Sequence, residues 1–121
     1  MPPAAQKLNK AIESADGILV AAPVYNYDVA AAAKNMIELT GSSWEEKVVG
    51  FLCAAGGNSS YMAVMAYANS LMLDFRCVII PRFVFATGDS FDGDNLIDKK
   101  IVRRIETVAD ELVRFTKALR S

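Results

Sequence analysis

The sequence predicts an α/β fold with a doubly wound parallel sheet of three core strands and flanking helices. Apolar runs of strand length recur at 17–22, 48–54 and 77–80, without the polar alternation of a strand that has one wet face. Segments with helical spacing separate these runs. Strands that alternate with helices along the chain are typical of a parallel sheet covered on both faces.

The spacing of apolar residues predicts four helices. They are expected at 4–14, 29–39, 60–73 and 98–119. The last carries apolar residues at spacings of four and three, which is the stripe of an amphipathic helix. The third is apolar nearly all round, so it needs cover on more than its sheet-facing side. Residues 81–93 are expected to be irregular, with a short extended piece at 83–85 as an option.

Composition narrows the class of protein. The chain has 121 residues, 53% of them hydrophobic and 22% charged, which predicts one folded domain with a core. A net charge of −1 without a dominant basic patch argues against nucleic acid as a partner. Apolar runs too short for a membrane span, and an N-terminus unlike a signal peptide, favour a cytoplasmic protein with no membrane partner. Cys53 and Cys77 are then reduced core thiols.

Histidine is absent from the sequence. Its absence removes the usual general base, the Ser-His and Cys-His nucleophile pairs and the commonest zinc ligand. We therefore expect no catalytic side-chain pair and no metal site. Chemistry has to come from a carboxylate, a hydroxyl or a cofactor.

Two loops follow predicted strands at the place where open α/β sheets bind ligands. The first strand stops at Pro23 and leads into Tyr25-Asn26-Tyr27. The second strand leads into Gly56-Gly57-Asn58-Ser59-Ser60, where glycine lets backbone approach a ligand and a helix start favours electron-rich atoms. The alternatives are that the tyrosines only cover the core and that a serine only caps the helix.

The first loop resembles the flavin-binding loop of the NADPH-dependent FMN reductases, a flavodoxin-like family. The family pattern there reads Pro-Glu-Tyr-Asn-Gly, then Pro-Gly, then Leu-Lys-Asn. The matching positions are Pro23, Tyr25, Asn26, Lys34 and Asn35. The departures are Val24, Tyr27, Ala30 and Ala31. Loss of glycine at Tyr27 and Ala31 is expected to change the loop's shape and to narrow access to the flavin.

The resemblance implies a single flavodoxin-like, partial flavin reductase domain over residues 1–121. It implies an oxidoreductase that passes hydride from NADPH or NADH through FMN to a small-molecule acceptor: a quinone, an azo compound, a metal oxyanion or free flavin. It also implies that no single side chain is essential as acid or base. The residues expected at the FMN are Pro23, Val24, Tyr25, Asn26, Tyr27, Gly56, Gly57, Asn58, Ser59 and Ser60.

The resemblance covers only the later part of the family's domain. No strand with a Ser-x-Arg-x-x-Ser loop precedes Gly17, so one and a half strand–helix units, roughly 50–60 residues, have no counterpart. In the flavodoxin strand order the missing first strand lies beside 17–22, which predicts a bare apolar edge at Ile18-Leu19-Val20. Either the chain is cut from an ordinary reductase, or it is natural and binds FMN weakly or not at all.

Assembly follows from the same features. A homodimer is expected through the helices at 29–39 and 60–73, or through the edge of the strand at 17–22, which pairs with a symmetry mate or a companion chain. The alternative function is a non-catalytic dimerising module that has lost FMN.

An acidic cluster, a basic cluster and the single tryptophan are each interpreted as structural features and not as ligand sites. Asp89, Asp92, Asp94 and Asp98 are read as a solvated loop that caps the last helix, not a cation site. Lys99, Lys100, Arg103 and Arg104 are read as the wet face of that helix. Trp44 is expected to close a loop over the core.

Overall fold

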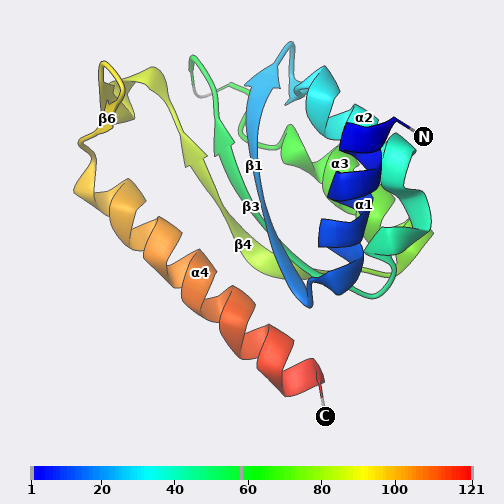
Figure 1. Ribbon diagram of the computed structural model, residues 1–121. Helices are drawn as coiled ribbons and strands as arrows, with labels where there is room; N and C mark the ends of the chain where they lie inside the picture. The colour runs from blue at the N-terminus through cyan, green and yellow to red at the C-terminus, as the bar shows by residue number, and fades with distance from the viewer. Residues whose placement is uncertain (1, 58, 121) are drawn as a thin grey trace.

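The computed structural model describes residues 2–57 and 59–120 (Figure 1). Its strands are β1 (Gly17–Tyr25), β2 (Asp28–Val29), β3 (Val48–Ala54), β4 (Val78–Ala86), β5 (Phe91–Asp92) and β6 (Asn95–Leu96). The main sheet has the order β2-β1-β3-β4, in which β1, β3 and β4 run parallel, while β5 and β6 form a separate hairpin. This confirms the predicted α/β class with its three parallel core strands.

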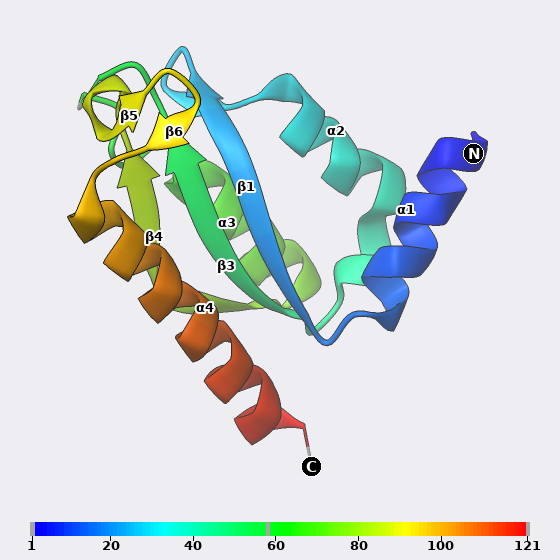
Figure 2. The same ribbon diagram turned by 60° about the vertical axis from the view of Figure 1, so that its left-hand side comes forward.

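Helices cover both faces of the sheet, as predicted. They are α1 (Pro3–Ser14), α2 (Ala31–Thr40), α3 (Val64–Phe75) and α4 (Lys99–Leu119). Figure 2 shows α4 on one face of the sheet and α3 on the other. In the same view α1 lies beyond β1, on the side away from β3, where it packs against α2 and the 3-10 turn η1 (Gly41–Trp44). Among the described residues no helix is long and apolar enough to cross a membrane.

The main core lies on the α3 face of the sheet. It joins Val20 and Phe51 of the strands to Leu71 of α3 and Ile12 of α1. Trp44 is fully buried there and donates its indole N–H to Thr40 Oγ1 at 2.8 Å, which confirms that it closes a loop over the core. A smaller cluster on the opposite face packs α4 against β4.

Both cysteines are free, buried thiols, in agreement with the sequence prediction. Burial raises the pKa of the Cys53 thiol to about 11. Burial also raises the pKa of the Cys77 thiol to about 11, against a smaller opposing effect of Lys47. The Cys77 thiol donates a hydrogen bond to the carbonyl oxygen of Trp44 at 3.1 Å. Such thiols are core residues and are not reactive at neutral pH.

Two predicted helices begin later than expected. The helix predicted from residue 29 begins at Ala31, because Asp28 and Val29 fold back onto β1 as β2. The helix predicted at 60–73 is α3, which begins at Val64 because the described residues before it form turns. The helix predicted at 98–119 is confirmed, with the Asp98 carboxylate accepting a hydrogen bond from the Lys100 N–H at 2.9 Å.

The prediction that residues 81–93 are irregular is wrong over 81–86, because β4 continues to Ala86. Val49 lies opposite Ile79 and Phe51 opposite Phe83, so β4 uses two more residues than β3 over this span. Such a bulge accommodates Pro81, which has no N–H for the ladder. The strand option at 83–85 is thereby confirmed as part of β4.

The bare edge predicted for β1 is present. On the side away from β3, the described strand β1 pairs only with β2, through Val24 with Val29 and Tyr25 with Asp28. Ile18, Leu19 and Val20 therefore have no strand partner on that side among the described residues.

Candidate functional site

The carboxyl ends of the three parallel strands meet at one edge of the sheet. Pro23 pairs with Ala54, and Ala54 pairs with Ala86. The Ala55 N–H donates to the Ala86 carbonyl at 2.9 Å and fixes the start of the second loop. The loops after β1, β3 and β4 therefore open side by side, as Figure 1 shows at the top of the sheet.

The first loop is a tight hairpin turn. Asn26 and Tyr27 have φ values of 51° and 61°, so both adopt the left-handed conformation of a two-residue hairpin turn. The Ala30 N–H donates to the Pro23 carbonyl at 2.9 Å and closes the base of the loop. Asn tolerates this conformation, whereas Tyr27 holds it under strain of about 1 kcal/mol or more.

The two tyrosines of this loop do not cover the core. Tyr25 is 62% exposed and Tyr27 is 59% exposed, so that alternative is wrong. Val24 is buried, so its side chain is not open to a ligand. The loop therefore presents two aromatic side chains on the rim of the strand-end edge.

The second loop presents open backbone. A Cβ atom added to Gly56 or Gly57 would meet nothing within 4 Å. One added to Gly88, in the third loop, would lie 3.7 Å from the Gly56 carbonyl oxygen, so the second and third loops are neighbours. Ser59 and Ser60 lie in the turns before α3, whose start has no side-chain cap, so the capping alternative is wrong. Asn58 lies outside the described residues.

An apolar cavity of about 310 Å³ adjoins the strand ends on the α4 face. Its lining residues are Ala21, Ala22, Pro23, Leu52, Cys53, Ala54, Val84, Ala86, Phe91, Leu96, Ile101 and Ile105. Pro23 is the only predicted site residue among them, and the rest of the described set lies outside this lining. Sequence reasoning missed Phe91 and Leu96, which only the β5–β6 hairpin brings to the sheet.

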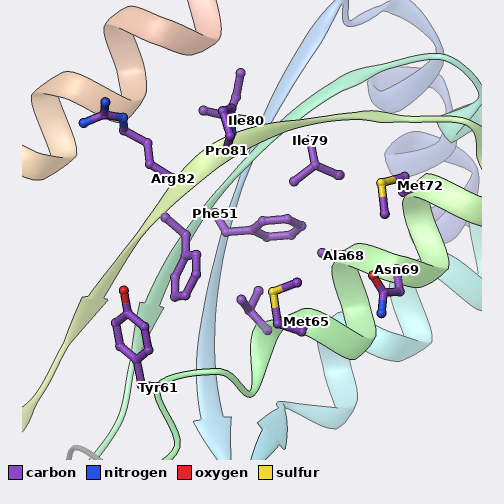
Figure 3. Close-up of a pocket in the computed structure, with 12 residues that line it drawn as sticks. Phe51, Tyr61, Met65, Ala68, Asn69, Met72, Ile79, Ile80, Pro81 and Arg82 are labelled. Atoms are coloured by element: carbon purple, nitrogen blue, oxygen red, sulfur yellow. The ribbon is translucent and has the colours of Figure 1, made fainter.

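A second, larger cavity lies away from the strand ends. It has about 480 Å³ between α3 and β4, and Figure 3 shows Phe51, Met65 and Met72 directed into this space. The lining is mainly apolar, and the converging loops lie elsewhere. We place the functional site by the loops, because in open α/β sheets ligands bind beyond the carboxyl ends of the strands.

The strand-end site suits a flat ring with a polar rim. The aromatic side chains give apolar contact, and the open backbone near Gly56 and Gly57 gives N–H and C=O groups. In the described part of the chain, no group of three or more His, Cys, Asp or Glu residues is placed to hold a metal ion.

A family model described as NADPH-dependent FMN reductase matches residues 1–92. The chain belongs to this family. The NAD(P)H-dependent FAD/FMN reductase of Geobacillus thermodenitrificans is 26% identical over 96% of the chain and 64% of its own length. The probable NADPH:quinone oxidoreductase 1 of Oryza sativa subsp. japonica is 30% identical over 98% of the chain and 64% of its own length. The chain thus spans under two thirds of these relatives.

Solved structures show the same fold. FerB, a flavoenzyme NAD(P)H:(acceptor) oxidoreductase from Paracoccus denitrificans, superposes with a TM-score of 0.77 at 20% identity, over 97% of the chain and 69% of FerB. The apo form of the NADH:FMN oxidoreductase EMOB gives 0.77 at 16% identity, over 98% of the chain and 62% of EMOB. The flavodoxin-like fold predicted from sequence is confirmed.

Proposed function

We propose that this chain is the ring-binding part of an NAD(P)H-dependent FMN oxidoreductase that reduces a small-molecule acceptor. The observation that supports it is the meeting of the Pro23–Tyr27 turn and the Gly56-Gly57 backbone at one strand-end edge, in a chain of the FMN reductase family. Several relatives are named quinone oxidoreductases, so a quinone is the first acceptor to test.

The described residues fit the isoalloxazine ring of FMN. Tyr25 and Tyr27 can flank the ring, and the open backbone at Gly56 and Gly57 can meet its polar edge. FMN, when bound, supplies the hydride chemistry, so the side chains only bind, orient and exclude water. The Ser-x-Arg-x-x-Ser phosphate loop is not in these 121 residues, so affinity for FMN is expected to rest on the ring contacts.

A flavin titration tests this function. Quenching of FMN fluorescence in the micromolar range, weakened by Tyr25→Ala and unchanged by Val113→Ala, supports it. Val113 is a fair control because it is an exposed apolar residue on α4, well along the chain from either loop. Absence of quenching would favour the alternative, a dimerising module that has lost FMN.

We also propose that a second copy covers the outer side of α2 and α3. Leu39 of α2 and Leu73 of α3 are exposed apolar side chains, whereas Met65 and Met72 of α3, also partly exposed, line the cavity between α3 and β4. Leu73 is 76% exposed, and contact with a second copy would remove this side chain from water. Sedimentation should show a dimer that Leu73→Lys converts to monomer and Val113→Lys does not. A wild-type monomer would contradict the proposal.

The open edge of β1 is the second assembly surface. The outer edge of β4 is protected against pairing with another strand by Pro81, the bulge and Arg82. The edge of β1 has no such protection, because residues 17–22 include no proline and no charged side chain. A cavity of about 430 Å³ separates this edge from α1. Since α1 lies beyond this edge (Figure 2), we propose that a single extended strand of a symmetry mate or a companion chain, and not a whole sheet, pairs with it.

A further inference from the structure

A third cavity lies along the outer edge of β4, apart from the strand-end site. It has about 380 Å³ and three elements build it: the turn before α3, β4 itself and α4. Its lining residues are Tyr61, Arg82, Phe83, Phe85, Arg104 and Val108. It therefore combines an aromatic wall with two guanidinium groups.

The aromatic wall is a platform held in place. The ring centroid of Tyr61 lies 5.2 Å from that of Phe83 and 5.6 Å from that of Phe85. Tyr61 nevertheless remains 54% exposed, so part of the ring is free to stack on a ligand. Figure 3 shows Tyr61 and Arg82 on opposite sides of the β4 ribbon. Stacking on such a ring is available to any flat heteroaromatic group.

The two arginines stand in different states. Arg82 Nε lies 3.3 Å from Glu111 Oε2. This ion pair orients the guanidinium, and the negative charge of Glu111 partly offsets the attraction of Arg82 for an anionic ligand. Arg104 is exposed and has no ion pair among the described residues. A planar guanidinium without a carboxylate partner is well suited to a phosphate group. Arg104 lies on the solvent-exposed face of α4, as predicted, and its side chain also lines this cavity.

The backbone of β4 adds hydrogen-bonding groups. In the described part of the chain β4 pairs only with β3, so its outer edge between Arg82 and Phe85 has N–H and C=O groups without strand partners. An aromatic platform, two guanidiniums and free main-chain groups together match a nucleotide that carries a phosphate near its base.

We propose that this cavity binds the adenosine 2′-phosphate end of NADPH and so favours NADPH over NADH. The inference rests on the proposed function. Tyr61 directly follows the second loop, and Arg82 lies four residues before Ala86 at the strand end, about 13 Å along a strand. A dinucleotide laid along β4 spans that distance, with its nicotinamide toward the strand-end site.

Calorimetry on flavin-free protein tests the inference with 2′,5′-ADP as the probe and 5′-ADP as the matched ligand. We expect 2′,5′-ADP to bind more tightly, and Arg104→Gln to weaken it by about tenfold, the effect of losing one charge-assisted hydrogen bond. Arg103→Gln removes the same charge from the neighbouring residue, which does not line the cavity, and should leave binding near wild type.

Two outcomes would overturn the inference: equal binding of both nucleotides, or equal losses in Arg103→Gln and Arg104→Gln. Tyr61→Leu should also weaken 2′,5′-ADP, whereas Tyr25→Leu should not. The FMN titration is a separate measurement, so protein that quenches FMN but ignores 2′,5′-ADP would refute this cavity's role and leave the proposed function standing.

Discussion

The Tyr67 hydroxyl on α3 donates a hydrogen bond to the Ala33 carbonyl oxygen on α2, at 2.9 Å. Since α2 follows the first loop and α3 follows the second, this bond ties together the helices behind both halves of the strand-end site. The same ring meets Phe51 of β3 edge to face, with centroids 5.9 Å apart. Burial raises the pKa of Tyr67, so the hydroxyl stays a donor at every physiological pH.

Tyr67→Phe removes that bond and leaves the ring. We expect the free energy of unfolding to fall by about 1 kcal/mol or more, because the Ala33 carbonyl loses its side-chain partner. Urea denaturation measures the loss. Tyr25→Phe changes an exposed hydroxyl and should be neutral, so equal stability in both variants would contradict the role of the bond.

Tyr27→Gly should stabilise the protein. Tyr27 holds φ at 61°, which glycine adopts without strain, so relief of about 1 kcal/mol is expected, less the added entropy of the unfolded chain. Asn26→Gly, at φ 51°, should gain less because Asn tolerates this region. Thermal unfolding of the two variants gives the comparison, and a Tyr27→Gly protein less stable than wild type would show that the turn is not strained.

Gly17→Ala should be costly and Gly56→Ala nearly neutral. A Cβ at Gly17 would lie 2.6 Å from Thr116 Oγ1, whose hydroxyl is already bonded to the Leu112 carbonyl, whereas one at Gly56 would meet open space. Displacing α4 from β1 should cost about 1–3 kcal/mol. Denaturant midpoints compare the pair, and matching midpoints would mean that α4 yields without penalty.

Stability should fall as pH rises from about 9 to about 11. Burial raises the pKa of Cys53 and Cys77 from 9.0 to about 11, so the unfolded chain loses these protons first and binds fewer of them in that range. Both thiols should resist a thiol reagent at pH 8 until the protein is unfolded. Cys53→Ala with Cys77→Ala should flatten the alkaline decline, and an unchanged slope would assign it to other groups.

Much of the fold was readable from local patterns. β3 has the predicted bounds, α4 follows its apolar stripe, and the bare edge of β1 follows from the strand order. The start of α2 was misplaced because Val29 and the alanines after it favour a helix, and nothing local shows that Tyr27 adopts a left-handed conformation. The length of β4 was missed because a proline ends most strands, and only pairing with β3 reveals the bulge.

The sites divide in the same way. Positions at the strand-end edge were predictable, both for Pro23 near the end of β1 and for Gly56 just after β3, because strand ends converge in a parallel sheet. Phe91 and Arg104 were not, because their positions depend on how a hairpin and a helix pack against β4. No local pattern distinguishes Arg104 from Arg103.

The contrast between the two sheet edges limits how this protein can polymerise. The proline, the bulge and the arginine disfavour strand pairing at the β4 edge, so edge association through β1 alone would end after one addition and give a finite complex. Substitutions that remove Pro81 and Arg82 would leave both edges of the sheet free to pair with other copies, which is the condition for a filament.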